Sequence, residues 1–437
     1  MRVALAVAAL LLAAAAPAVP APVVEATLDN GLRVLLLEDH RSPIASVQMW
    51  YRVGSRDERP GATGLAHFLE HLMFKGTLAH GKGMFSRLVE ENGGQDNAFT
   101  SQDATAYYVD IAAERVELVL ALEADRMRHL LLDPREVDSE RQVVMEERRT
   151  RSEDDPDGAL AEELSAVAFK AHPYRWPIIG WMEDIQRIEA GQLRAFYDAY
   201  YRPNNALLVV VGDIDAPALL ERVRALFGAI PRGPEPPPVL AVEPRPNGER
   251  RVTVRKPGAR LPVVGLAYHV PNHRSPDAPA LALLATLLSE GRAARLHRAL
   301  VYERQVALDT SGDYPYSSRD PSLFWLSATA QPGHTPAELE QALLDELERL
   351  KVEPVSEEEL DRARNQTEAG FVWGQDSVHA RASTLARFEL MGSWRLLERY
   401  VPEVRAVTAA DVQRVARAFF AADRRTVGIL LPAAGEP

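Results

Sequence analysis

The chain of 437 residues is 46% hydrophobic and 26% charged, and its net charge at pH 7 is −12. Its length predicts two or three domains, because a single hydrophobic core stops growing beyond about 250–300 residues. The negative charge and the lack of a Lys/Arg block argue against nucleic acid or an anionic membrane as a partner. The absence of cysteine excludes thiolate catalysis, thiolate metal ligands and disulfides.

The first 21 residues have the pattern of a secretory signal peptide. Arg2 precedes an apolar stretch over residues 3–16, and the triplet APA at residues 16–18 resembles an A-x-A cleavage site. The apolar stretch is shorter than the ~20 residues that a membrane span needs. We therefore expect residues 1–21 to be removed, a periplasmic or secreted location, and no membrane partner.

A proline-rich segment divides the rest of the chain. Residues 231–248 contain seven prolines, which predicts a stiff, extended linker because each proline fixes φ and donates no hydrogen bond. Residues 22–230 and 249–437, on either side, share one order of segments: an apolar strand, a helix ending near a glycine, a proline-led acidic helix and a closing apolar strand. This repetition predicts an α+β fold of two homologous domains from an internal duplication. We expect each domain to be a mostly antiparallel sheet with helices packed on one side.

A metal-binding pattern lies in the first half, on a short helix expected between Thr63 as N-cap and Gly76 after its C-terminus. His67 and His71 are four residues apart, so their imidazoles leave one face of the helix and can share a tetrahedral Zn²⁺. Glu70 lies on nearly the same face and can reach a metal-bound water as a general base. The pattern H-x-x-E-H is the inverted form of the zinc-peptidase helix, and it predicts a zinc-dependent peptidase.

The third ligand is expected on a separate helix, where Glu140, Glu146 and Glu147 are available. Here the sequence resembles the pitrilysin/insulinase family of inverzincin metallopeptidases. It is similar to the half-length branch that includes the mitochondrial processing peptidase β subunit and bacterial relatives. Glu147, 76 residues after His71, matches the position of the family's Glu ligand. The resemblance further implies that Glu140, two turns earlier on the same face, supports a ligand imidazole or the active-site water, while Glu146 projects elsewhere.

The resemblance extends over nearly the whole chain after residue 21. Family-like stretches include residues 30–34, 172–174, 200–205 and 212–213. Members of the family carry an open strand beside the zinc, and a peptide substrate adds to it as an extra strand. The matching strand follows Gly93-Gly94, and the resemblance therefore implies that Asn97, Ala98 and Phe99 bind an unfolded peptide.

The second half lacks the metal pattern. Ala282, Ala285 and Thr286 stand where the two histidines and the glutamate of the first half would fall. We therefore expect one Zn²⁺ per chain, with residues 22–230 as the zinc-bearing catalytic domain and residues 249–437 as a homologous non-catalytic domain.

The family resemblance also concerns the quaternary structure. Fully active members carry an Arg and a Tyr seven residues apart in the second half, but this chain has Val301 and Leu308 at those positions. The resemblance therefore implies a heterodimer, in which a homologous subunit without the zinc motif supplies the Arg/Tyr pair. The alternative is a homodimer in which Tyr302 or Arg304 substitutes.

A non-catalytic, structural subunit of the same fold is a further alternative. Relatives of that kind usually lack the motif glutamate or a ligand. Glu70 and Glu147 are both present in this chain, which favours the catalytic role.

Overall fold

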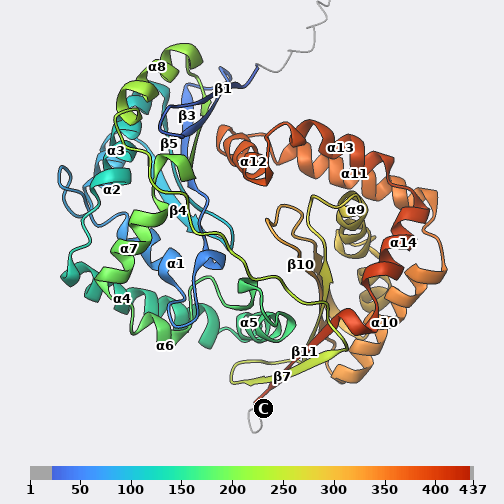
Figure 1. The fold of residues 1–437 in the computed structure, drawn as a ribbon. Coiled ribbons are helices and arrows are strands. Elements are labelled where there is room, and N and C mark those ends of the chain that lie inside the picture. Colours follow the sequence, from blue (N-terminus) through green and yellow to red (C-terminus); the bar gives the residue numbers. More distant parts are fainter. Residues whose placement is uncertain (1–21, 434–437) are drawn as a thin grey trace, which may run out of the picture.

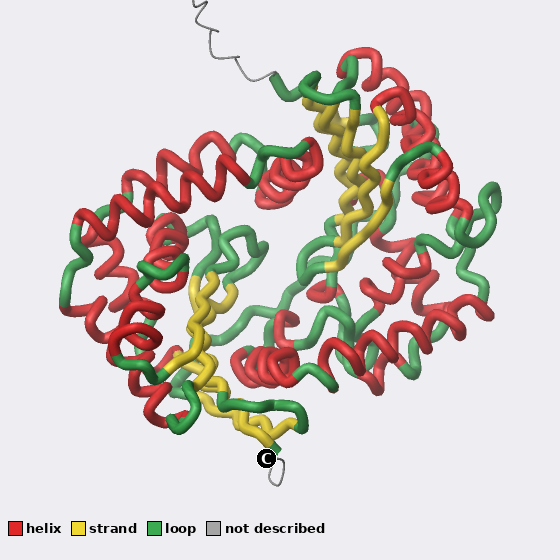
Figure 2. The backbone as a smooth tube through the Cα atoms, turned by 180° about the vertical axis from the view of Figure 1, so that it is seen from behind, coloured by secondary structure: helices red, strands yellow, loops and turns green. Residues whose placement is uncertain are grey.

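The computed structural model describes residues 22–433, so the expected signal peptide lies outside the described residues. The chain forms two lobes, each built on one β-sheet (Figure 1). The helices of each lobe lie mainly on the outer face of its sheet, and the two sheets face each other (Figure 2). Within residues 22–433, no helix is long and apolar enough to cross a membrane.

The strands of the first sheet are β1 (Val24–Thr27), β2 (Arg33–Glu38), β3 (Ile44–Tyr51), β4 (Gln95–Thr100), β5 (Thr105–Ala112) and β6 (Ala206–Gly212). They lie in the order β1-β2-β6-β3-β5-β4, and all neighbours are antiparallel except β2 and β6. Strand β4 is therefore an edge strand.

The second sheet repeats this topology. Its strands are β7 (Arg250–Lys256), β8 (Val263–Val270), β9 (Ala307–Asp313), β10 (Ser322–Ala330) and β11 (Arg425–Pro432). They lie in the order β7-β11-β8-β10-β9, and only β7 and β11 are parallel. Strands β2, β6, β3, β5 and β4 thus correspond to β7, β11, β8, β10 and β9. The two-domain α+β fold and its internal duplication are confirmed.

The helices follow the same repetition. The first half contains α1 (Leu65–Leu72), α2 (Met84–Glu91), α3 (Val116–His129), α4 (Pro134–Arg148), α5 (Pro156–Ala168), α6 (Met182–Ile185), α7 (Ala190–Tyr200) and α8 (Ala216–Phe227). The second half contains α9 (Ala278–Ser289), α10 (Pro336–Val352), α11 (Glu357–Trp373), α12 (Val378–Met391), α13 (Leu396–Ala406) and α14 (Ala409–Phe419). Helix α9 follows β8 as α1 follows β3.

The segment between the two sheets, residues 231–249, contains no helix or strand. It is nevertheless fastened to the first lobe. The carboxylate of Glu243 accepts hydrogen bonds from the backbone N–H groups of Lys170, Ala171 and His172, at 2.8, 2.8 and 3.0 Å. The linker therefore runs along a defined path over the surface.

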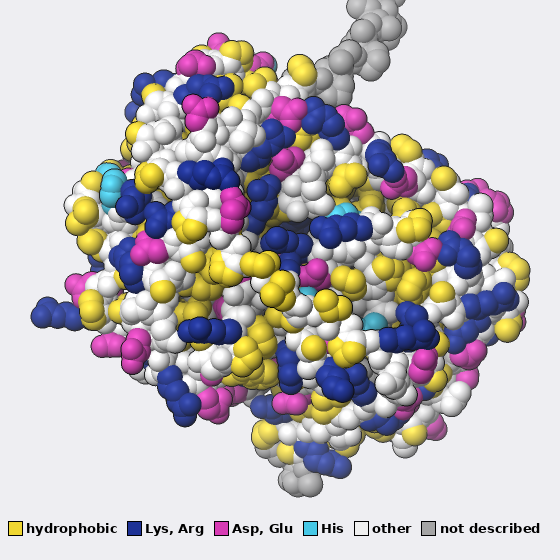
Figure 3. All heavy atoms as spheres, in the orientation of Figure 1, with side chains coloured by type: hydrophobic (Ala, Val, Ile, Leu, Met, Phe, Trp, Pro, Cys, Tyr) yellow, Lys and Arg dark blue, Asp and Glu magenta, His cyan; other side chains and the backbone are white. Residues whose placement is uncertain are grey.

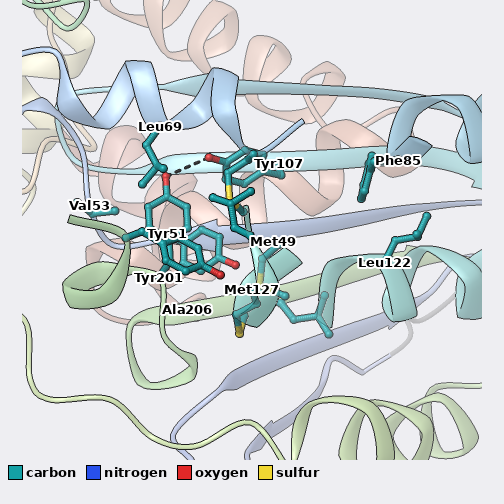
Figure 4. Packing of buried hydrophobic residues seen from close by; sticks show 14 of the residues in the cluster. Met49, Tyr51, Val53, Leu69, Phe85, Tyr107, Leu122, Met127, Tyr201 and Ala206 are labelled. Carbon is teal, nitrogen blue, oxygen red and sulfur yellow. Dashed lines mark hydrogen bonds between the residues drawn. The ribbon is translucent and has the colours of Figure 1, made fainter. Parts of the chain in front are cut away.

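Helix α1 packs on the hydrophobic core of the first lobe (Figure 4). Tyr51, Tyr107 and Tyr201 are buried together, with the rings of Tyr51 and Tyr201 4.3 Å apart. The hydroxyls of Tyr107 and Tyr201 share a hydrogen bond of 3.0 Å, which satisfies polar groups that have no access to water. Leu69 of α1 packs in the same cluster. The apolar face of α1 thus lies on a rigid base, and its opposite face is left for polar side chains.

Each sheet is also covered on its inner face by one helix of the other half. Helix α12 packs on β3 and β6, where Leu385 lies against a cluster that includes Leu207 and Val209. Helix α5 packs on β7, β8 and β11. Its Leu164 lies close to Gly428 of β11, and a Cβ atom on Gly428 would be 2.5 Å from the Leu164 side chain. The central strands are apolar on both faces, so both faces need cover. The expected outer helical layer is present, and the exchanged helices add a second one.

Candidate metal centre

Helix α1 begins later than the sequence predicts. Its N-cap is Gly64, with φ of +90°, and not Thr63. A Cβ atom on Gly64 would lie 2.5 Å from the carbonyl oxygen of Ile179, and the facing Gly180 also has a positive φ. Only glycine permits both this close approach and this conformation. The hydroxyl of Thr63 instead donates to the carboxylate of Asp184 at 2.7 Å.

A buried carboxylate holds the first turn of α1. The two oxygens of Glu58 accept hydrogen bonds from the backbone N–H groups of Gly64 and Ala66, each at 2.8 Å. Burial raises the pKa of Glu58 well above its usual value, while the two amides lower it. Sequence reasoning missed this residue, because no local pattern connects a glutamate to a helix that begins seven residues later.

The C-terminus of α1 also differs from expectation. The helix ends at Leu72, with Met73 as its C-cap, so Gly76 lies beyond it in a separate turn with φ of +114°. Lys75 is outside the helix, and its ammonium group lies 2.5 Å from the carboxylate of Glu140 on α4. The charge of Lys75 therefore stabilises a neighbouring carboxylate and not the end of its own helix.

Three predicted side chains converge between α1 and α4. His67, His71 and Glu147 each offer one ligand atom, and these atoms all lie within 4.8 Å of one another. A carboxylate oxygen of Glu147 is 3.6 Å from Nε2 of His67 and 3.2 Å from Nε2 of His71. Ligand atoms at tetrahedral zinc lie about 3.4 Å apart, given bonds of about 2.1 Å. Two imidazoles and one carboxylate thus fit zinc in donor type, and the distances from Glu147 to the two imidazoles are close to those of a zinc site.

The amphipathic character of α1 produces this convergence. Leu65 and Leu69 face the buried core, whereas His67 and His71 leave the other side of the helix, one turn apart. Helix α4 contacts α1 and brings Glu147 to them from its last turn. Within residues 22–433, this is the one cluster of three or more such side chains that could hold a metal ion.

The charges of the site reinforce one another. Burial alone would lower the pKa of His71, but contacts with Glu140 and Glu147 raise it to about 9. The pKa of Glu147 lies well below its usual range, because contacts with His67 and His71 outweigh its burial. Positive charge on the histidines therefore stabilises the ionised form of Glu147. A bound cation would stabilise it in the same way.

Glu140 lies behind His71. Its carboxylate is 2.9 Å from Nδ1 of His71, the nitrogen opposite the one that faces Glu147. Burial would raise the pKa of Glu140, but His71 and Lys75 hold it below its usual value. An ionised carboxylate at Nδ1 fixes the tautomer in which Nε2 is free to bind a metal.

Glu70 is held outside this cluster by the edge strand. Its carboxylate accepts a hydrogen bond of 2.5 Å from the hydroxyl of Thr100, the last residue of β4. Sequence reasoning missed Thr100, although its place directly after Phe99 in the predicted substrate strand was a usable signal. Glu146, by contrast, is exposed and pairs with Arg149 at 2.8 Å.

Among residues 22–433, strand β4 pairs on one side only, with β5. Ala98 packs against the core beneath α1, whereas Phe99 packs on the opposite face of the sheet. The N–H of Ala98 donates to the side chain of Asn97 at 2.8 Å. The three predicted substrate-binding residues thus lie on an open edge, with side chains on both faces.

The second lobe carries the positions of the expected Arg/Tyr pair. Val301 is half-buried in a π-helical segment, His297–Glu303, and Leu308 is on the edge strand β9 with 44% of its surface exposed. Tyr302 is largely exposed, and Arg304 forms an exposed ion pair with Asp345 at 2.9 Å.

Family models and similar proteins all relate this chain to one group of peptidases. Two family models match the chain: Insulinase (Peptidase family M16) over residues 33–180 and Peptidase M16 inactive domain over residues 187–367. The chain is 33% identical over 410 residues to the zinc protease PqqE of Helicobacter pylori, covering 93% of this chain and 92% of that protein. It is 26% identical over 402 residues to the probable mitochondrial-processing peptidase subunit beta of Arabidopsis thaliana, covering 90% and 75% of the two chains.

A solved structure agrees with these matches. The crystal structure of a protease from Helicobacter pylori superposes with a TM-score of 0.91 at 32% identity, over 95% of this chain and 100% of that one. The match over both lobes, the half-length size and the H-x-x-E-H motif on α1 all point the same way. The chain belongs to the insulinase family of peptidases, family M16, and to its half-length zinc-protease relatives.

Proposed function

We propose that this chain is a zinc-dependent endopeptidase that hydrolyses unfolded peptides. The observation that carries the proposal is the convergence of His67, His71 and Glu147, with their ligand atoms within 4.8 Å of one another, while Glu70 stays outside this set. These three side chains would hold one Zn²⁺, and Glu140 would orient His71. A bound zinc would act as a Lewis acid on the scissile carbonyl and on water.

Glu70 does the proton transfer. Its carboxylate takes the proton of the attacking water and passes it to the leaving amine, so no covalent intermediate with the protein is needed. The hydrogen bond from Thr100 holds one carboxylate oxygen and leaves the other for this role. Because Thr100 ends β4, the base is tied to the strand that receives the substrate.

The substrate binds as an added strand along β4. The outer side of β4 has no neighbouring strand among residues 22–433, so its backbone groups can bind any extended peptide, with Asn97, Ala98 and Phe99 as its contacts. The N–H of Ala98 would then exchange the side chain of Asn97 for the peptide. Folded proteins cannot present an extended backbone there. We therefore expect unfolded peptides to be cleaved and compact proteins to be spared. The pattern of residues 1–21 supports a periplasmic or secreted location for this activity.

The active form is a heterodimer with a homologous subunit. Val301 and Leu308 are apolar and cannot donate a hydrogen bond to a developing oxyanion, and loss of such a donor typically costs ~10²–10³ in rate. A subunit without the zinc motif would supply the Arg/Tyr pair. A homodimer is the alternative, but Arg304 is already paired with Asp345.

Metal analysis and peptide cleavage test the proposal. His67→Ala and Glu147→Gln should lose stoichiometric zinc, whereas Glu70→Gln should keep zinc and lose hydrolysis. The exposed neighbour Glu146→Gln is the matched control and should keep both. Zinc retained in full by Glu147→Gln would refute the ligand assignment. Co-purification from the native source, with assays of each subunit and of the mixture, tests the heterodimer; full activity of the isolated chain would refute it.

A further inference from the structure

A cavity of about 470 Å³ lies between the two lobes, beside the end of β4. Trp50 and Phe99 form an aromatic wall, with their rings edge to face at 5.2 Å. Ser101, the residue after Thr100, also lines the cavity. The cavity therefore lies one residue beyond Thr100, the strand residue that contacts Glu70, and on the face of the sheet toward which Phe99 points.

Four arginines line the same cavity: Arg52, Arg274, Arg319 and Arg387. They come from four separate segments, namely the end of β3, the loop after β8, the loop before β10 and helix α12. Figure 3 shows Lys and Arg side chains gathered where the two lobes meet.

The four guanidinium groups form no ion pair or hydrogen bond in the described part of the chain. Among residues 22–433, none of them lies within 4.0 Å of a carboxylate or donates a hydrogen bond. Arg52 is half-buried, and burial lowers its pKa; the charge of Glu389 opposes this shift, and the nearby charge of Arg319 adds to it. Unpaired like charges in a partly closed space are costly, and an anionic ligand removes that cost.

The two acidic residues of the cavity are already engaged elsewhere. Asp103 accepts the hydroxyl of Tyr174 at 2.7 Å and the backbone N–H of Arg319 at 3.0 Å. Glu389 accepts from Nε of Arg33 at 2.7 Å and from the backbone N–H of Trp394 at 2.9 Å. The charge of Glu389 offsets part of the charge of Arg52. Neither carboxylate forms an ion pair with any of the four guanidinium groups, so two carboxylates stand against four arginines and the cavity keeps an excess of positive charge.

We propose that this cavity, the arginine pocket, binds a carboxylate of the peptide that lies along β4. The inference rests on the proposed peptidase function and adds a substrate preference to it. Side chains of an added strand alternate between the two faces of the sheet, and those on the Phe99 face point toward the pocket. The aromatic wall receives the stem of a side chain or the last residue of the peptide, and the arginines bind its carboxylate. The carboxylate is supplied by an Asp or Glu side chain or by the C-terminus.

Binding to the zinc-loaded Glu70→Gln variant tests the pocket without cleavage. Four versions of one peptide separate the sources: glutamate or glutamine at an internal position, each with a free or an amidated C-terminus. We expect a version with the relevant carboxylate to bind roughly tenfold or more tightly than its neutral counterpart, as for a charge-assisted hydrogen bond. Replacing Arg319→Gln or Arg387→Gln in this background should remove most of that difference and leave binding of the neutral peptide unchanged.

Arg292→Gln is the matched control, because Arg292 is an exposed arginine of the second lobe that does not line the pocket. It should keep the full preference. Equal binding of all four peptides would overturn the carboxylate preference. If the parent chain still cleaved these peptides, the proposed peptidase function would stand without it. Arginine-dependent binding without cleavage by the parent chain would support the pocket and count against the isolated chain as a peptidase. Inorganic phosphate that binds through the arginines, with no carboxylate preference, would also overturn it.

Discussion

Glu58 is expected to control both the stability of the first lobe and its affinity for zinc. Glu58→Ala leaves the N–H groups of Gly64 and Ala66 buried without an acceptor. Each such amide costs about 1–3 kcal/mol, and release of the buried carboxylate offsets part of this. We expect a net loss of about 2–4 kcal/mol, and about half of that for Glu58→Gln, which keeps one acceptor oxygen.

The loss should also appear in metal binding. Helix α1 has only eight residues and is too short to persist without tertiary support. His67 is in its first turn, so fraying at Gly64 displaces this ligand first. If the full cost is transmitted to the site, the zinc affinity of Glu58→Ala falls by roughly 30- to 1000-fold.

Two measurements check this reasoning: urea unfolding of the metal-free protein and zinc competition against a chromophoric chelator. Glu117→Ala is the control, because Glu117 is also in the first turn of a helix but is exposed and pairs with Arg222 at 2.9 Å. It should change stability by less than about 0.5 kcal/mol. If Glu58→Ala changes the stability and the zinc affinity as little as Glu117→Ala does, Glu58 does not stabilise α1.

Three further predictions concern the base, the metal and the exchanged helices. Thr100→Val should keep zinc but lower kcat/KM by roughly 10- to 100-fold, because the hydrogen bond to Glu70 is lost; unchanged kinetics would separate Thr100 from catalysis. In the metal-free protein the pKa of His71 is raised from 6.5 to about 9, so its stabilising contribution is complete below pH 6.5 and is lost as pH rises through 9. Zinc must displace this proton, so zinc affinity should rise about tenfold per pH unit over the same window, and a flat titration would contradict the charge assignment. Leu385→Ala should destabilise the protein by about 2–5 kcal/mol, measured by urea unfolding, whereas the exposed Leu240→Ala in the linker should not.

The placement of the two histidines side by side, and of Glu140 and Glu147 on one helix face, follows from determinants that are local in the sequence. A spacing of four residues puts two histidines on one face of any helix, and a spacing of seven puts Glu140 and Glu147 on one face of α4. The duplication was readable for a similar reason, since the order of apolar strands and acidic helices is a property of the chain itself. The pairing of the two histidines and the duplication required only periodicity and element order, whereas the choice of Glu147 among the three glutamates of its helix rested on the family resemblance.

The missed features depend on tertiary contacts. Thr63 and Gly64 have similar N-cap preferences, and the close approach of Gly180 to the backbone of Gly64 decides which of them is the N-cap. Likewise, the sequence of α12 is that of an ordinary amphipathic helix. Its pattern does not indicate that the helix packs on the sheet of the other half. Thr100 holds Glu70 only because β4 lies beside α1 in the fold.

The exchange of α5 and α12 has a consequence for how the chain is synthesised. The strands of the first sheet are complete at Gly212, but α12, which covers the inner face of that sheet, ends only at Met391. Ribosomes add about 5–20 residues per second, so these 179 residues delay its arrival by roughly 10–35 s. During that interval Leu207, Val209 and Val211 are an uncovered apolar surface. The nascent first half is therefore a natural client for a chaperone, and neither half expressed by itself should stay soluble.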